Sequence, residues 1–426
     1  MKDIFINRYD HYEILLFIAG LVSTFQGVLF HGVTLFSWFL LALVIIGVIK
    51  KRGNGNFNFK DTKTVLIGLV LVSMTITEII TVYLDEYPEW TGRSVKNYVL
   101  VFAVFVLFFV LRGNSRYGEI FFKGVMVSSI IQYVFCCIEY IAYKTKGLDL
   151  TEKYLSVATV LKDGRPTITG LTTNPGMLVP VILISMCLSK SLIVKVMALG
   201  TALIINSSTA VICVALYFLI LAALIISDRV RNGLNLGKYA VGIIAMAILI
   251  IISFPSLREK IIALYGYLWE RLGAASEGVG EGINGMSERL HFRYYWSMPY
   301  IFDQIGLTRI LFGFGKNCSG IPFSELYAQY QGELWIPETD PIATLYDVGV
   351  VGTVAMYGML IKMFFDFYRR SVRKCIFMAC VLLGGAFYGF QMTWFLLLEL
   401  FLWDGMLCIR DDSVMKNKNV GVNTCG

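Results

Sequence analysis

The chain has 426 residues, of which 57% are hydrophobic and only 16% are charged, and its mean hydropathy is +0.68. This composition excludes an ordinary water-soluble domain and is typical of a polytopic membrane protein. The formal net charge of +7 does not predict a nucleic-acid partner, because the Lys and Arg residues gather in alternate short loops, as they do in the cytoplasmic loops of membrane proteins.

Apolar segments long enough to cross a bilayer, about 20 residues each, recur along the chain. Because lipid offers no hydrogen bonds to the backbone, each such segment is predicted to be a helix. The expected fold class is therefore all-α, with one membrane domain over residues 1–426 and about twelve transmembrane helices. The charge pattern predicts a multi-pass protein of the cell (inner) membrane with both termini in the cytoplasm.

The first half of the chain contains five predicted spans. The polar start, 1–13, is followed by no small-residue cleavage site, so the first apolar run is interpreted as a retained helix and not as a signal peptide. The basic cluster at 50–52 assigns the end of the second span to the cytoplasm. A smaller external loop, 144–172, follows the fifth span. The five spans are expected near 13–29, 31–49, 64–84, 97–111 and 120–142.

The second half is organised around a much larger external loop, residues 255–341, called the large loop below. Its length of roughly 85 residues far exceeds that of most connections, and loops of this length usually carry function. Three spans are expected between the smaller loop and residue 231, and a ninth, at 239–254, leads into the large loop. The last three spans are expected near 342–365, 375–389 and 391–408.

Cysteine and histidine usage predicts neither a disulfide framework nor a metal centre. Eight of the nine cysteines lie in or beside apolar segments or at the extreme C-terminus, and Cys318 alone lies in the large loop. No external pair is therefore available for a disulfide, and three histidines are too few for a multi-histidine site. No metal and no cofactor is expected.

Four acidic residues fall within or at the ends of apolar segments, where burying a charge is costly. Such residues either have structural roles at helix ends or belong to a proton or ion pathway. A pathway requires them to converge, and the spans contain no matching set of basic residues. A structural role is the favoured interpretation, and a transport role stays open. The four residues are Glu78, Glu139, Glu399 and Asp404.

The predicted external position of the two polar loops limits the reactions that an enzyme could catalyse there. No nucleotide is supplied outside the cytoplasm, so an enzyme on that face needs a substrate that already carries its activation energy. A sugar linked to a lipid through a diphosphate meets this requirement, and its lipid tail can lie among membrane helices. Such a reaction needs cationic groups for the diphosphate and a carboxylate or imidazole for the acceptor hydroxyl.

Both kinds of group occur in the two external loops. Arg289 and Arg293 are four residues apart, so they share one face of a predicted helix, and Arg165 offers a third guanidinium. Glu338 and Asp340 precede the tenth span, where an acid lies near the positive end of a helix. The alternative is that these residues form ordinary interfacial ion pairs and helix caps, and the residues alone leave both interpretations open.

Five segments, in this order, resemble the pattern of the bacterial O-antigen ligase and polymerase superfamily. The resemblance covers roughly residues 165 to 352 and implies a GT-C-like, metal-independent glycosyltransferase that moves a glycan from undecaprenyl diphosphate to a sugar hydroxyl. The segments are GRPTITGLTTNPG (164–176), NSST (206–209), RLHFRYYW (289–296), LFGFG (311–315), and an acidic signature followed by YDVGVVG (346–352).

The resemblance also implies roles for individual residues. Arg165 and Arg289 match the arginines that bind the diphosphate in this family, with Arg293 as a second choice, and Asn174 of the Asn-Pro stretch is a candidate substrate-binding residue. Where ligases commonly have His-Asn, this chain has the acidic sequence 338–340, which looks more like polymerases of O-antigen, capsule or exopolysaccharide. The catalytic residues implied are Arg289, Glu338 and Asp340.

The expected function is therefore polymerisation of undecaprenyl-diphosphate-linked oligosaccharide repeat units on the outer face of the membrane. Donor and acceptor are both lipid-linked glycans, and a chain-length regulator is a candidate protein partner. One alternative is an O-antigen ligase, which transfers finished glycan to another acceptor. The other is a polysaccharide flippase or transporter, which generally keeps its polar groups in a cavity at the membrane midplane, often on broken helices.

Overall fold

A computed structural model describes residues 10–30, 33–50, 61–84, 88–155, 161–162, 165–166, 168–172, 174–205, 207–231, 306–316, 339–386, 389 and 392–407. The candidate residues Arg289, Arg293 and Glu338 lie outside these ranges, as does the predicted ninth span. One compact unit comprises Met1–Tyr217 and Leu307–Gly426. A second unit, Phe218–Gly306, is described along residues 218–231 and at Gly306.

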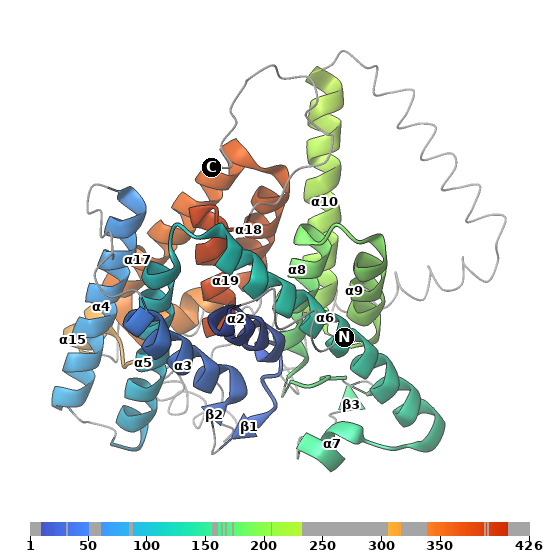
Figure 1. Ribbon diagram of the computed structural model, residues 1–426, viewed down its shortest axis with the longest axis horizontal. Coiled ribbons are helices and arrows are strands. Elements are labelled where there is room, and N and C mark those ends of the chain that lie inside the picture. Colours follow the sequence, from blue (N-terminus) through green and yellow to red (C-terminus); the bar gives the residue numbers. More distant parts are fainter. Residues whose placement is uncertain are drawn as a thin grey trace, which may run out of the picture. The chain divides into compact units, whose positions relative to one another are not determined.

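Helices dominate the described residues (Figure 1). The prediction of an all-α protein is confirmed, with two antiparallel pairs of two-residue strands added: β1 (Leu29–Phe30) with β2 (Val33–Thr34), and β3 (Leu161–Lys162) with β4 (Arg165–Pro166). The helices are α2 (His11–Val22), α3 (Leu35–Lys50), α4 (Thr62–Leu84), α5 (Pro88–Leu111), α6 (Ser115–Lys146), α7 (Leu150–Leu155), the 3-10 helix η1 (Pro175–Leu178), α8 (Val179–Leu188), α9 (Leu192–Ile204), α10 (Ser208–Arg231), α15 (Leu307–Phe312), α17 (Asp340–Arg370), α18 (Val372–Gly385) and α19 (Thr393–Asp404).

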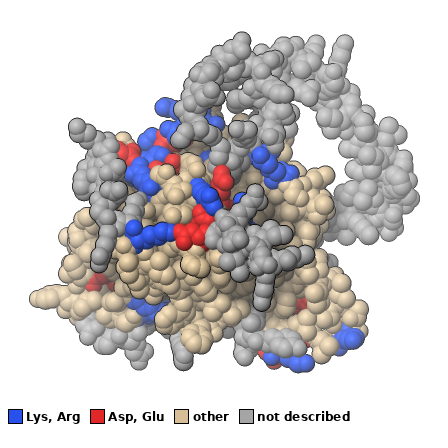
Figure 2. Space-filling view, in the orientation of Figure 1, with Lys and Arg blue, Asp and Glu red and all other residues tan. Residues whose placement is uncertain are grey.

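Four helices of the described chain are long and apolar enough to cross a membrane: α4, α6, α17 and, within α5, Thr91–Leu111. Large apolar side chains such as Ile45, Ile79 and Ile141 are 58 to 62% exposed, as expected of side chains that face lipid. Uncharged side chains cover most of the described surface in Figure 2, and the charged ones gather in small groups. The described part of the chain therefore has the character of a membrane protein.

The first helix ends earlier than the hydropathy predicts. The apolar run extends to residue 29, but α2 stops at Val22, and the hydroxyl of Ser23 donates to the carbonyl of Gly20. Gly27 then donates its backbone N–H to Leu171, far along the chain. Because this tertiary hydrogen bond satisfies the backbone after the helix, the chain can leave the helix inside an apolar segment.

Glycines bring α2 and α6 into close contact. A Cβ atom added at Gly20 would lie 2.2 Å from the carbonyl oxygen of Phe121, and one added at Gly124 would lie 2.2 Å from that of Phe17. Small residues at matching positions let two helix backbones approach, which is a common way for helices to associate in membranes. This contact fixes α6, which carries Glu139 further along.

A group of charged residues ties together the ends of α4, α5 and α19. Arg112, directly after α5, forms ion pairs with Asp61 and Asp404, and its Nε lies 3.0 Å from Asp404 Oδ1. Partial burial opposes ionisation of Asp61, but the hydrogen bond and the charge of Arg112 outweigh it and lower the pKa of this carboxyl. Asp404 thus has the structural role favoured for it from the sequence.

α19 lies in the core of the larger unit. Every residue from Trp394 to Trp403 is buried, and the helix packs against α5, α6 and α17. Phe401 makes an edge-to-face contact with Phe121 of α6, with the ring centroids 5.7 Å apart. Glu399 lies in the middle of this helix, so its carboxyl is placed among apolar side chains.

Candidate functional site

The site is built around an interruption in α17. The helix starts at Asp340 with Pro341 in its first turn, a position that suits proline, and Gly349 then breaks it with φ 65° and ψ −173°. A side chain at Gly349 would be strained by this positive φ, and its Cβ would lie 2.3 Å from the backbone carbonyl of Leu311. Glycine therefore permits both the break and the close approach of α15.

The chain after α15 fills the break. Phe314 and Gly315 donate their backbone N–H groups to the carbonyls of Tyr346 and Asp347, each at 2.9 Å. A broken helix leaves carbonyls without partners, and burial would make them costly, so these two bonds stabilise the interruption. The sequences LFGFG and YDVGVVG, both part of the family resemblance, are thus in direct contact.

Four polar residues, called the helix-break cluster, surround this junction: Glu78, Ser94, Lys316 and Asp347. Lys316 Nζ lies 3.1 Å from Asp347 Oδ2, and the Asp347 side chain is only 4% exposed. The hydroxyl of Ser94 reaches both oxygens of Glu78 at 2.7 and 2.6 Å, and the backbone N–H of Lys316 donates to Glu78 at 2.8 Å. Every acid in the cluster therefore has a donor.

Arg309 reinforces the same junction from α15. It is 6% exposed, and its guanidinium donates to the hydroxyl of Thr81 at 3.3 Å and to the carbonyl of Gly313 at 3.2 Å. The guanidinium also lies 5.3 Å from the centre of the Phe314 ring, within the range of a cation–π interaction. Arg309 therefore fixes the turn that presents Lys316.

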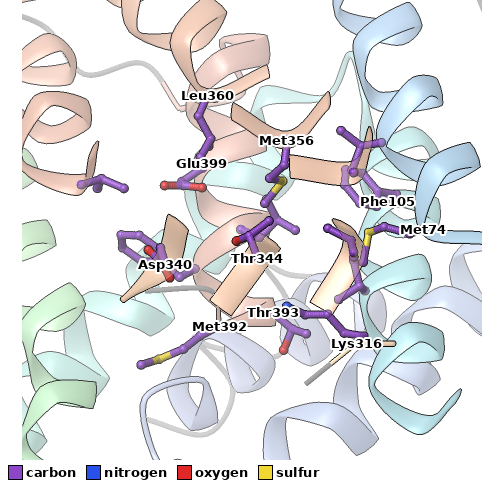
Figure 3. A pocket seen from close by; sticks show the side chains of 17 residues that line it. Met74, Phe105, Lys316, Asp340, Thr344, Met356, Leu360, Met392, Thr393 and Glu399 are labelled. Atoms are coloured by element: carbon purple, nitrogen blue, oxygen red, sulfur yellow. The ribbon is translucent and has the colours of Figure 1, made fainter. Parts of the chain in front are cut away.

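A cavity of about 50 Å³ opens beside the cluster, between α4, α5, α17, α18 and α19 (Figure 3). This volume exceeds what a single water molecule needs. Its polar lining side chains include Lys316, Asp340, Thr344 and Glu399, whereas most of the rest is apolar, from residues such as Met74, Phe105, Met356 and Leu360. The cavity is therefore amphipathic.

Two acids, Asp340 and Glu399, share this cavity. They are 8% and 4% exposed, and Figure 3 shows both on the same side of the pocket, away from Phe105 and Met74. Asp340 lies close to α18, since a Cβ atom added at Gly385 would lie 2.8 Å from Asp340 Oδ2. Among the described residues, no hydrogen-bond donor reaches Oε1 of Glu399.

The stretch GLTTNPG is held elsewhere, against α6. Glu139 accepts hydrogen bonds from the hydroxyl of Thr151 at 2.6 Å and from the backbone N–H of Gly170 at 2.9 Å. Gln132, two turns earlier, accepts from the backbone N–H of Leu171 at 2.9 Å and donates to the carbonyl of Thr24 at 2.8 Å. These two side chains anchor the segment to the helix, which is a structural role.

The candidate site residues predicted from the sequence lie in different parts of the structure. Asp340 lines the cavity, whereas Asn174 is the N-cap of η1, where its Oδ1 accepts from the backbone N–H of Gly176 at 2.8 Å. Arg165 lies in β4, paired with Lys162 of β3, and its backbone alone is described. Arg289, Arg293 and Glu338 lie outside the described residues. Asn174 is not among the residues that line the cavity.

The ion pair of Lys316 with Asp347 was not predicted from the sequence. It lies in the interior, because the side chains of Lys316 and Asp347 are 14% and 4% exposed. One signal was available: Lys316 directly follows two glycines that both adopt positive φ, Gly313 at 75° and Gly315 at 106°. Glycines so spaced predict a tight turn, and the residue after it is held in place.

The chemistry that the cavity can support follows from its lining. A lysine offers a positive charge to an anion, a carboxylate can accept a proton from a hydroxyl, and the apolar walls can hold a hydrocarbon chain. Within the described residues no group of three or more metal-ligating side chains converges. No protein-family model matches the chain, and no curated protein matches it.

Proposed function

We propose that this protein polymerises undecaprenyl-diphosphate-linked oligosaccharide repeat units of an O-antigen, capsule or exopolysaccharide, by glycosyl transfer on the outer face of the cell membrane. The proposal includes about twelve transmembrane helices in a GT-C-like arrangement, with both termini in the cytoplasm. Its basis in the sequence is the ordered set of segments between residues 165 and 352, with the acidic sequence 338–340 favouring a polymerase.

The observation that supports it most is the amphipathic cavity. Asp340, a candidate base, lines the same space as Lys316, and apolar side chains of α4, α5 and α17 form most of the remaining wall. A lipid-linked diphosphate sugar likewise combines a polar part, the anionic diphosphate with its sugar hydroxyls, with an apolar part, the hydrocarbon chain. Three of the helices that line the cavity, α4, α5 and α17, are long and apolar enough to cross a membrane, which suits a substrate that is anchored in the bilayer.

In the proposed reaction an acceptor hydroxyl attacks the anomeric carbon of the donor sugar. The new bond forms between that carbon and the acceptor oxygen, and the bond to the diphosphate oxygen breaks. Asp340 or Glu338 accepts the hydroxyl proton, and the diphosphate departs with its lipid. Arg289 and Arg165, with Arg293 nearby, stabilise the negative charge on the leaving group, and Lys316 adds a positive charge at the cavity.

The test is a reconstituted reaction. Purified protein in lipid is mixed with a lipid-linked repeat unit, and the product is examined for lipid-linked chains of two or more repeats. We expect wild-type protein to extend the chains and Arg289→Ala to reduce turnover by about two to three orders of magnitude, the usual cost of removing one preorganised charge-stabilising group. Arg289→Lys is the matched control, because it keeps the charge but loses the fork.

An experiment in cells distinguishes a polymerase from a ligase. In a deletion strain, loss of a polymerase leaves single repeats on the final acceptor, whereas loss of a ligase leaves none. Near-normal long-chain polysaccharide in a strain complemented with Arg289→Ala would contradict the assignment of that arginine. Absence of any polymer extension by the wild-type protein in the reconstituted reaction would contradict the polymerase itself.

A transporter is the second candidate, because of one specific observation. α17 is interrupted at Gly349, and the buried pair of Lys316 and Asp347 lies at the interruption. Transporters often bind substrates and ions where helices are broken near the membrane midplane. Movement of a lipid-linked glycan across vesicles that contain the purified protein, without any chain extension, would favour this candidate over the polymerase.

A further inference from the structure

Glu399 differs from the other glutamates buried in the helices. It lies in the middle of α19, is 4% exposed and lines the cavity, and no donor among the described residues reaches its Oε1. An ionised carboxylate in such a position loses its hydration and gains no compensating hydrogen bond at that oxygen. A neutral carboxylic acid avoids most of this cost.

The groups that face the cavity from neighbouring helices are mostly uncharged. From α17, Asp340 is a second carboxyl group in the lining of the cavity. The lining contributed by α4, α5 and α18 is uncharged, and α6 meets α19 through the ring contact of Phe121 with Phe401. Lys316 is the one cation among the lining residues that the structure describes, and its Nζ is 3.1 Å from Asp347.

Two other glutamates provide an internal comparison. Glu78 accepts from Ser94 and from the backbone of Lys316, and Glu139 accepts from Thr151 and from the backbone of Gly170. Donors of this kind stabilise the ionised form of a carboxyl group, whereas a carboxyl without them retains its proton more tightly.

We propose that Glu399 is a proton-binding site within the helix bundle: its carboxyl holds a proton at neutral pH and exchanges it through the cavity. The ligand is the proton itself. The proposal does not rest on glycan transfer, because the geometry of α17, α19 and the cavity carries it, and its test measures no product of that reaction.

Dicyclohexylcarbodiimide provides the test, because it is apolar and reacts with protonated carboxyl groups in apolar surroundings. The proton of the acid moves to a carbodiimide nitrogen, and the carboxylate oxygen bonds to the central carbon. An acyl shift from oxygen to nitrogen then gives a stable N-acylurea, with nothing lost. Peptide mass spectrometry of the full chain in detergent or lipid locates the adduct and gives its rate of formation.

We expect Glu399 to be labelled at neutral pH at least about tenfold faster than Glu78 and Glu139, and its labelling to fall as the pH rises. Glu399→Gln should remove the adduct from the α19 peptide and leave the slow labelling of the other two unchanged.

The wild-type profile tests the site without any variant. Glu399 unlabelled at neutral pH, or labelled no faster than Glu78 and Glu139, overturns the proposal. The polymerase assay is scored separately, so failure of glycan transfer leaves the labelling result intact.

Discussion

Glu139 and Glu399 are both glutamates buried in helices of one bundle, yet their surroundings are opposite. Glu139 accepts hydrogen bonds from Thr151 and Gly170 and thereby anchors the GLTTNPG segment. Glu399 lines a cavity, and no described donor reaches its Oε1. The comparison shows that burial of an acid does not by itself indicate function: the partners decide whether it holds the fold together or is available for chemistry.

The largest effect is expected from turning a partnered acid into an unpartnered one. Lys316→Met leaves Asp347 buried without the ammonium group, and loss of one member of a buried ion pair costs about 3 to 5 kcal/mol. We therefore expect a clear fall in the free energy of unfolding, measured by denaturant titration in detergent. The double variant Lys316→Met, Asp347→Asn should recover most of this loss, and no recovery would show that the pair is not the cause.

A smaller loss is expected at Glu139. Glu139→Ala leaves the hydroxyl of Thr151 and the backbone N–H of Gly170 without their acceptor, and each unsatisfied buried group costs about 1 to 3 kcal/mol. Glu139→Gln keeps one acceptor oxygen and is the matched control. Thermal unfolding of both variants, together with proteolysis near residue 170, measures the effect. A Glu139→Ala protein as stable as the wild type would remove the anchoring role.

The next prediction concerns the pH dependence of stability at Asp61, an acid outside the predicted spans. Its pKa is lowered in the folded state, so its contribution to stability is present above the unfolded pKa, ordinarily 3.8, and is lost as the pH falls through the folded value. We expect Asp61→Asn to be less stable than the wild type at neutral pH, by about 1 kcal/mol or less because the pair is partly exposed. The difference should disappear on acidification. A difference that persists at the lowest pH values would assign the effect to something other than ionisation.

The smallest effect is expected at Glu399, which we propose to be protonated at neutral pH. Glu399→Gln replaces a protonated carboxyl by an amide of similar shape, so the free energy of unfolding should change by less than about 0.5 kcal/mol at neutral pH. Glu139→Gln, measured under the same conditions, should cost more. If Glu399→Gln proves as destabilising as Glu139→Gln, the contrast between the two glutamates fails.

Hydropathy was sufficient for the helical character of the chain, but local contacts set the ends of its helices. The apolar run from residue 13 to 29 predicts one continuous span, whereas α2 stops at Val22, where Ser23 bonds back to Gly20 and Gly27 donates to the distant Leu171. The span predicted at 97–111 begins earlier, at Pro88, a residue that suits the first turn of a helix. The partner of Gly27 lies far along the chain, so no local pattern contains it.

The candidate site was predictable in part. Asp340 was selected because acids favour helix starts, and the structure puts it in the wall of the cavity. The pair of Lys316 with Asp347 was not predictable from the sequence, since the two residues are 31 positions apart and meet only because α17 breaks at Gly349. The roles proposed for Arg165, Arg289, Arg293 and Glu338 stay predictions from the sequence.

The sequence by itself determined that the chain forms apolar helices and that its charges gather at their ends, because both follow from the cost of placing backbone and charge in lipid. The tertiary structure alone decided which buried acids have partners. Glu78, Glu139 and Glu399 look alike in the sequence, each a single acid in an apolar run. Only the packing of distant segments supplies donors to the first two and a cavity to the third.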